Sequence, residues 1–245
     1  MQASKTCCDS CPLKSCGARG FVPDDIPTGA QYIVRGEAPG STELVEGKPF
    51  TGKAGFVLKN WIIRAVPQLQ VALEKGKVGF SNNLKCLPPE TQGRPYPQGD
   101  TKRKAEEHCR QFTKWPESVK TAILCGEHPQ RFYFGEELDK EDATDRSLGR
   151  DAKGVMGRVG RVYDRAYCFP CQRVLSASEV KCEACGGSGK VLRWTFAPHP
   201  AYILRQPALV GQAQEAFKIA VGMDKVLEPA AITWQAALCE ILNER

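Results

Sequence analysis

The sequence has 245 residues, enough for one α/β domain with a small insertion, and its net charge of +6 suits a polyanionic partner such as DNA or RNA without requiring one. It contains no run of about 20 apolar residues and no apolar leader, so we expect a cytoplasmic protein without membrane segments. Because a reducing cytoplasm disfavours disulfides, the 12 cysteines indicate metal ligands.

The first feature in chain order is a group of four cysteines within ten residues: Cys7, Cys8, Cys11 and Cys16. Cys8 and Cys11 form a C-x-x-C pair, which can chelate iron or zinc through a tight turn. Cys7 and Cys16 are surplus to this pair, and we interpret them as bystanders. Residues 17–30 are rich in Gly, Pro and Asp and predict a loop.

The stretch from Gly36 to Gly55 follows a short apolar run, residues 31–35, that predicts the first buried strand. It combines Gly/Pro turns with three carboxylates, Glu37, Glu43 and Glu46, and the aromatic ring of Phe50. A strand that ends in such a turn and then enters a helix is typical of an α/β active-site loop. The predicted helix ends near Pro67, and its apolar side carries Val57, Leu58, Trp61, Ile62 and Ala65.

Residues 78–86 predict a second strand, followed by a long polar loop through Gly99. Asn82 and Asn83 lie near the end of this strand, where open α/β sheets bind ligands, although a turn asparagine is the simpler interpretation. Residues 100–115 predict a basic amphipathic helix. A third buried strand follows at 121–126.

Two histidines and a charged segment receive no functional role from the sequence. His128 begins the loop predicted after the third strand, and His108 lies in the basic helix beside Cys109. Residues 136–154 are dense in charge and poor in apolar residues, which predicts a solvated loop.

Two C-x-x-C knuckles, Cys168/Cys171 and Cys182/Cys185, are separated by ten residues. Four thiolates in this arrangement can bind one tetrahedral Zn²⁺. The flanking residues 160–163 and 190–194 predict antiparallel strands, so we expect the knuckles to cap a β-hairpin.

A further strand is predicted at 193–197 and runs into a Pro-bounded loop, His199 to Pro207. Two helices are predicted to close the chain. The first carries Ala213, Phe217, Ala220 and Val221 on one face, and the second carries Trp234, Leu238, Ile241 and Leu242.

Together, the strand-end loops resemble the iron–sulfur-containing family 4 uracil-DNA glycosylases. Members read G-E-[GA]-P-G-x-x-E and G-[RK]-P-F-x-G-x-A-G, matched here by residues 36–43 and 47–55. They continue with T-N-x-x-K-C-x-P-P, matched by 81–89 with Ser81 in place of Thr. The last motif, H-P-[AS]-Y-L-L-R-x-P, is matched by 199–207.

The resemblance implies a three-layer αβα fold with a central, mainly parallel four-stranded sheet. We expect a single domain over residues 1–245, with the zinc-ribbon hairpin inserted at 160–193. The implied activity is DNA repair: uracil is flipped out of single- or double-stranded DNA and its N-glycosidic bond is hydrolysed, leaving an abasic site. We expect a monomer associated with the nucleoid.

A [4Fe–4S] cluster is the cofactor that the resemblance implies, in addition to the Zn²⁺ at the knuckles. The ligands carried over from the family are Cys8, Cys11, Cys86 and Cys109. Cys7 in place of Cys8 remains an alternative. We interpret the cluster as structural, because it would join the N-terminus to two distant segments.

The resemblance also implies the roles of the pocket residues. The pocket includes Gly36 and Ala38, the Phe50 ring offers a stacking face for a flipped base, and the Asn82 amide can pair with N3–H and O4 of uracil. Glu43 would exclude thymine by contact with its C5 methyl group. Cytosine presents the opposite hydrogen-bonding pattern and would leave a partner unpaired.

The resemblance also implies which residues take part in cleavage of the glycosidic bond. His199 would donate a hydrogen bond to the developing charge on uracil O2, and neutral imidazole suffices for this. Glu37 would orient water or stabilise the cationic sugar. Many uracil glycosylases carry a water-activating aspartate at the position of Ala38, and its absence here leaves the activating group unassigned.

The loop at 199–207 is expected to contact DNA, with Tyr202 or Leu204 as a wedge in the minor groove and Arg205 as a phosphate anchor. Leu204 is equally compatible with a core position. The basic hairpin would either extend the DNA-contact surface or only stabilise itself. Two other functions stay open: a binder of modified or deaminated DNA that does not cut, and a glycosylase for another damaged base.

Overall fold

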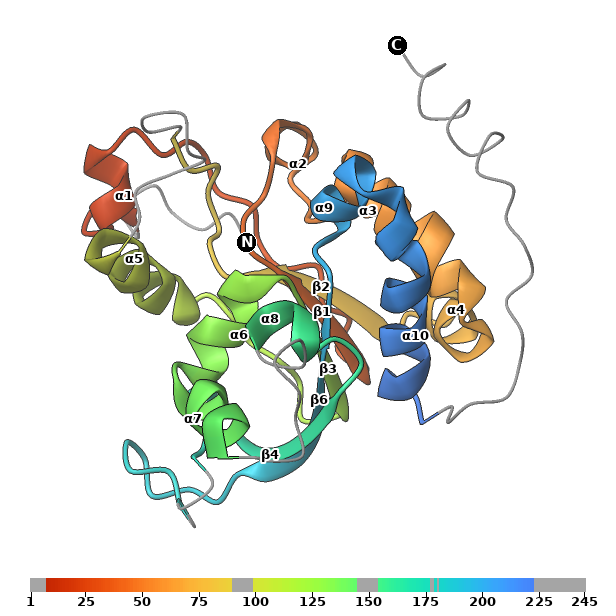
Figure 1. The fold of residues 1–245 in the computed structure, drawn as a ribbon. Helices are drawn as coiled ribbons and strands as arrows, with labels where there is room; N and C mark the ends of the chain where they lie inside the picture. The colour runs from red at the N-terminus through yellow and green to blue at the C-terminus, as the bar shows by residue number, and fades with distance from the viewer. Residues whose placement is uncertain (1–7, 90–98, 145–153, 177–178, 180, 223–245) are drawn as a thin grey trace.

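The computed structural model describes residues 8–89, 99–144, 154–176, 179 and 181–222, and its centre is a six-stranded sheet in the order β2-β1-β3-β6-β4-β5 (Figure 1). Four strands run parallel: β2 (Val78–Asn82), β1 (Tyr32–Gly36), β3 (Thr121–Cys125) and β6 (Lys190–Ala197). β4 (Val162–Cys168) and β5 (Arg173–Val174) extend one edge in antiparallel pairing. The predicted α/β class with a mainly parallel four-stranded core is confirmed.

The central strands are almost entirely buried, which is why they read as apolar runs in the sequence. β1 and β2 pair in a register that sets Gly36 opposite Asn82. Because the carboxyl ends of neighbouring parallel strands meet at one edge of a sheet, the first two predicted motifs lie together. The third motif follows β6 at the same edge, since β6 runs parallel to β3.

Helices cover both faces of the sheet (Figure 1). One layer begins with α3 (Lys53–Phe56), which continues as a π-helix over Val57–Ile62 and a 3₁₀ turn over Ile63–Ala65. The predicted helix ending near Pro67 is therefore confirmed. This layer also contains α4 (Pro67–Glu74), α9 (Pro200–Arg205), a 3₁₀ turn at Pro207–Leu209 and α10 (Val210–Ala220).

The opposite layer contains α5 (Asp100–Arg110), α6 (Glu127–Phe134) and α7 (Glu137–Thr144). Three shorter helices complete the described structure: α1 (Pro12–Ser15), α2 (Ser41–Glu46) and α8 (Gly154–Gly157). In Figure 1, α1 lies beside α5, and the two helices are in contact. The N-terminal cysteine segment is thus held against the helix that carries Cys109.

Several predicted loops are helical. The segment 136–154 contains α7, because Leu138 is buried and Asp139 and Glu141 form ion pairs with Arg158 and Arg165. His128 lies within α6 rather than in a loop.

The loop predicted at 199–207 contains α9, in which Pro200 occupies the first turn and needs no N–H partner. The segment 36–55, predicted as a loop, contains α2. The basic helix predicted over 100–115 ends at Arg110, and the strand predicted over 78–86 ends at Asn82.

The predicted helix with Trp234, Leu238, Ile241 and Leu242 lies outside the described residues, as does Cys7. Among the residues that the structure describes, no helix has the length and apolar character to cross a membrane.

Candidate functional site

A cavity of about 540 Å³ opens at the carboxyl ends of the parallel strands. It is lined by residues 37–43, 52–54, Phe50, Asn82, Leu87, Pro88, His199 and Ala201. The size falls in the range of small-molecule sites. All three strand-end motifs contribute to the lining, so the predicted pocket residues are brought together, except that Gly36 packs against Phe50 and Asn82 rather than lining the cavity.

Gly36 allows the Phe50 ring and the Asn82 amide to approach each other. A Cβ atom at Gly36 would lie 2.6 Å from Asn82 Oδ1 and 2.7 Å from Phe50 Cζ. Phe50 is held in the left-handed backbone region, with φ of 55°, and its carbonyl packs against Gly55, where a Cβ would lie 2.0 Å from the Phe50 oxygen. The ring is thereby fixed on the floor of the cavity.

Asn82 is 5% exposed at the end of β2. Its backbone carbonyl accepts a hydrogen bond of 2.6 Å from Lys85 Nζ, while its side-chain amide has no hydrogen-bond partner among the described residues. Lys85 is itself buried and also pairs with Asp24. The backbone of Asn82 is therefore anchored, and its amide is available to a ligand.

Glu43 clamps the loop that forms one wall of the cavity. Its two carboxylate oxygens accept hydrogen bonds from the backbone N–H groups of Gly40 and Gly52, at 3.0 and 2.9 Å. Charge-assisted bonds of this kind are stronger than neutral ones. The buried Glu43 side chain is consequently a fixed part of the wall.

His199 caps α9 and faces the cavity. Its Nδ1 accepts a hydrogen bond of 3.2 Å from the Ala201 N–H, so the proton of the neutral ring lies on Nε2. Burial lowers the pKa of His199 to about 4, and the charge of Glu37 only partly offsets this effect. The side chain is therefore a neutral hydrogen-bond donor at physiological pH.

Glu37 is held by Lys102 and His128, two residues for which no role was predicted. Its Oε1 lies 2.8 Å from Lys102 Nζ and 2.7 Å from His128 Nε2. Burial favours the protonated acid, but the hydrogen bond from His128 and the charge and hydrogen bond of Lys102 outweigh it and lower the pKa of Glu37. The carboxylate is therefore ionised at neutral pH.

A second polar network connects β1, the end of β2 and α5. The buried Arg35 donates to Asn83 Oδ1 at 2.8 Å and to Ser81 Oγ at 2.7 Å, and Asn83 in turn donates to Glu106 at 3.0 Å. Asn83 thus connects β1 to α5. It has a supporting role, and Asn82 is the asparagine that lines the cavity.

The first predicted cysteine set lies in one packed group. Cys11, Cys86 and Cys109 are buried together with Leu84, and Cys8 packs against them. A backbone hydrogen bond of 3.0 Å from Cys11 N to Cys8 O forms the tight turn expected of the C-x-x-C pair. Burial, and then the neighbouring Cys109, Cys11 and Cys8, raise the pKa of Cys86 to about 12. Four thiols grouped in this way fit a cluster with four cysteine ligands.

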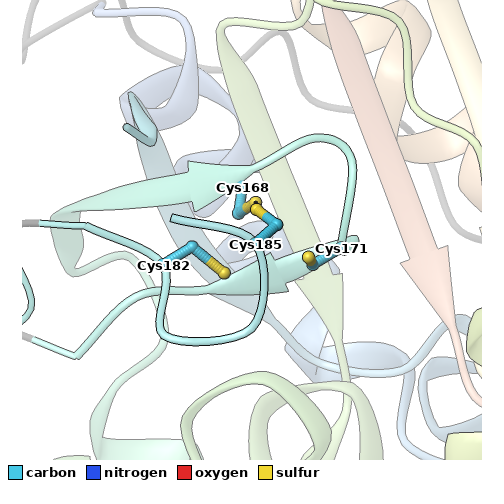
Figure 2. A group of neighbouring side chains, drawn as sticks. All are labelled: Cys168, Cys171, Cys182 and Cys185. Atoms are coloured by element: carbon cyan, nitrogen blue, oxygen red, sulfur yellow. The ribbon is translucent and has the colours of Figure 1, made fainter. Parts of the chain in front are cut away.

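The second cysteine set lies at the tip of the hairpin between β4 and β6. Figure 2 shows Cys168, Cys171, Cys182 and Cys185 gathered in one group. Their sulfur atoms all lie within 4.8 Å of one another, a spacing at which one ion can contact all four. The set can therefore hold a single metal ion. As predicted, the flanking strands pair in antiparallel fashion.

The predicted DNA-contact residues all lie on α9. Tyr202 and Leu204 are half-buried, and Leu204 packs against the main apolar core. Arg205 is exposed, with its guanidinium 5.7 Å from the centre of the Tyr202 ring. Of the hairpin's basic residues, Arg173 pairs with Glu179, Arg165 with Glu141, and Lys190 with the Glu117 carbonyl.

Sequence reasoning missed Lys102 and His128. Lys102 precedes Cys109 by seven residues on α5, which places both on one helical face, and this spacing was the available signal. His128 carried no such signal, because its position depends on how α6 packs against the sheet.

Comparison with known proteins gives consistent results. The model of the uracil DNA glycosylase superfamily matches residues 23–221. A type-4 uracil-DNA glycosylase of Pyrobaculum aerophilum is 27% identical over 226 residues, which cover 91% of this chain and 93% of that protein. A type-4 uracil-DNA glycosylase of Saccharolobus solfataricus is 28% identical over 145 residues, 58% of this chain and 62% of the relative.

Proposed function

Because this chain belongs to the uracil DNA glycosylase superfamily, we propose that it is a DNA repair enzyme that flips uracil out of DNA and hydrolyses its N-glycosidic bond, leaving an abasic site. The observation that carries the proposal is the cavity in which the Phe50 ring, the Asn82 amide and the neutral His199 converge. Each supplies one of the interactions that a flipped uracil requires.

Base recognition rests on three side chains. Phe50 stacks on the uracil ring, and the Asn82 amide donates to O4 and accepts from N3–H. Glu43 excludes the C5 methyl group of thymine. Its two hydrogen bonds to Gly40 and Gly52 support this role, because a wall that is tied to the backbone cannot retreat from a larger base.

Cleavage breaks the bond between uracil N1 and sugar C1′, and the electron pair stays on the base. His199 donates its Nε2–H to the charge that develops on O2, and the Ala201 N–H on Nδ1 supports this tautomer. Glu37 orients the attacking water or stabilises the cationic sugar. Gly36 and Ala38 complete the pocket.

For the cofactors, we propose that Cys8, Cys11, Cys86 and Cys109 hold a [4Fe–4S] cluster, and that Cys168, Cys171, Cys182 and Cys185 hold Zn²⁺. The cluster supplies a structural junction between the N-terminus, the segment after β2 and α5. The grouped sulfur atoms support the zinc assignment.

The hairpin 160–193 is then a zinc-ribbon insertion in a single glycosylase domain that acts as a monomer. We propose that DNA is contacted by α9, with Tyr202 or Leu204 as the wedge and Arg205 on a phosphate. The partial burial of Leu204 against the core supports a rigid wedge.

The test is uracil release from single- and double-stranded DNA by the metal-loaded protein, compared with His199→Ala. We expect loss of one oxyanion donor to reduce turnover about 10²–10³-fold while DNA binding persists. His108→Ala removes a histidine that contacts Phe112 outside the cavity and serves as the matched control.

Two outcomes would redirect the assignment. A wild-type protein that binds uracil-containing DNA and releases no base is a binder rather than an enzyme. Release of another damaged base from a duplex panel, with uracil left intact, would indicate a glycosylase of different specificity.

A further inference from the structure

Lys102, His128 and Glu37 form a compact polar triad between three separate elements. Glu37 follows β1, Lys102 lies on α5 and His128 lies on α6. Oε1 of Glu37 contacts both Lys102 Nζ and His128 Nε2, at 2.8 and 2.7 Å. Lys102 Nζ also contacts His128 Nδ1, which closes the triangle.

The contacts define one consistent set of protons. An ammonium group has only donors, so Lys102 donates to Glu37 Oε1 and to His128 Nδ1. With Nδ1 accepting, the neutral His128 ring carries its proton on Nε2 and donates it to Glu37. The triad therefore contains a charged lysine, a neutral histidine and an ionised carboxylate.

This arrangement leaves one oxygen of Glu37 available. Both hydrogen bonds from the described residues go to Oε1, and the side chain is 21% exposed where it lines the cavity. Oε2 can thus accept a hydrogen bond from a water molecule. The adjacent Ala38 offers only a methyl group for that purpose.

Resting on the proposed function, we propose that Lys102 and His128 are positioning residues that hold Glu37 as a carboxylate whose Oε2 takes the proton of the attacking water. The water oxygen forms the new bond to sugar C1′ as the bond to uracil N1 breaks. The base leaves with the electron pair of that bond and is protonated by solvent, and Glu37 returns its proton to solvent.

The electrostatic surroundings of Glu37 agree with this role. Lys102 and His128 favour its ionised form. The groups that face it from other positions are His199, which stays neutral, and Glu106 on α5, a buried acid whose pKa is raised chiefly by burial. Removal of Lys102 or His128 therefore raises the pKa of Glu37, and the active carboxylate is lost first at low pH.

The first experiment is single-turnover uracil release at pH 5 and pH 8. In Lys102→Met and His128→Leu, we expect the rate relative to wild type to fall on the order of tenfold more at pH 5 than at pH 8, because the hydrogen bonds of both residues and the charge of Lys102 stabilise the ionised acid. Lys102→Arg and His128→Gln keep a donor to Oε1 and should restore most of the rate at pH 5.

Lys104→Met is the matched control. Lys104 lies on the same helix, is 63% exposed and pairs with Asp100, so its loss should leave both rates unchanged. An equal loss at both pH values in Lys102→Met and His128→Leu would indicate a purely structural role and overturn the proposal.

The second experiment does not depend on activity. The chain has 3 histidines, so their ring nitrogens can be followed individually by ¹⁵N NMR of the metal-loaded protein. We expect the Nε2–H tautomer at His128, with resonances that shift in Glu37→Gln and Lys102→Met. Unshifted His128 resonances in Glu37→Gln would overturn the triad even if uracil is released. A wild-type protein with the expected NMR response and no uracil release would instead contradict the proposed function.

Discussion

The two cysteine groups differ in how much of the chain they connect. Cys168, Cys171, Cys182 and Cys185 belong to one hairpin, and their neighbours are Ala166 and Leu175 of the same hairpin. Cys8, Cys11, Cys86 and Cys109 come from the N-terminus, the segment after β2 and α5, and Ala38 of the cavity packs against them. The first group is local, whereas the second joins the elements that surround the cavity.

Loss of the N-terminal cysteine group should therefore affect the cavity more than loss of the hairpin group. α5 carries Cys109 at one end and Lys102, a partner of Glu37, near the other. Cys86 follows Asn82 by four residues, with Lys85 bonded to the Asn82 carbonyl between them. Disorder at the N-terminal group therefore reaches the reacting groups, while the hairpin contacts α5 through the bond from Arg110 to the Gln172 carbonyl, at the end of the helix far from Lys102.

The largest effect is expected from Cys109→Ala. We expect loss of bound iron, a decrease of more than about 4 kcal/mol in the free energy of unfolding, and loss of uracil release, because metal loss belongs to the most destabilising class of changes. Iron analysis, thermal unfolding and the release assay measure this.

Cys125→Ala is the matched control for that change. Cys125 is buried in β3 and lies in the apolar core rather than in either cysteine group. It should keep both metals and lose no more than about 1–2 kcal/mol. A Cys109→Ala protein that retains its iron would refute the ligand assignment.

The cysteine groups also show what the sequence could predict. Cysteine spacing and Gly/Pro-bounded strand ends are local signals, and the strands, the C-x-x-C pairs and a site at the strand ends were predicted from them. Cys86, Cys109 and the roles of the pocket residues came from the family resemblance instead. The burial of Arg35 was not predicted. Arg35 lies within the apolar run of β1, and its buried guanidinium is accommodated by Asn83, Ser81 and the Tyr133 ring of α6.

Residues that meet only through tertiary packing were missed for the same reason. From the sequence, Lys102 is one more cation on a basic helix, and only the fold places it beside Glu37. The helix α7 was mistaken for a loop because its ion pairs with Arg158 and Arg165 come from later in the chain. The sequence shows which residues are charged, but it does not show which of them form ion pairs in the fold.

The next largest effect is expected from Gly36→Ala. This change should disturb the cavity while both metals stay bound. The added Cβ would meet Asn82 and Phe50 at less than 3 Å, so at least one of the two must move. We expect about a hundredfold loss of uracil release, the scale of a 1 Å misplacement, with a stability cost of about 1–3 kcal/mol.

Iron and zinc contents should remain those of the wild type in Gly36→Ala. Gly211→Ala is a suitable control, because a Cβ at Gly211 in α10 would meet no atom within 4 Å beyond its chain neighbours and the backbone of its own helix. Metal loss in Gly36→Ala would contradict this prediction, because it would show that a change in the cavity also disrupts the N-terminal cysteine group.

A smaller catalytic effect is expected from Cys182→Ala. The hairpin should lose its zinc and its protection from proteolysis, while the rate of uracil release changes by less than about threefold and the iron content is unchanged, because the ligands of a structural ion stabilise their own module. Metal analysis and single-turnover kinetics on the same preparation test this. A large loss of rate with iron retained would show that the hairpin supports the cavity.

The smallest effect concerns DNA contact, and it distinguishes the hairpin from α9. Arg205 is exposed, whereas Arg173 on the hairpin is already paired with Glu179. We expect Arg205→Ala to reduce the slope of log affinity against log salt concentration by about one, as loss of one phosphate contact does, and Arg173→Ala to leave it unchanged. Binding of a uracil-containing duplex across a salt series gives both slopes. Equal decreases in the two variants would make the hairpin part of the DNA-contact surface, because the ion pair with Glu179 would then have to open to release Arg173 to a phosphate.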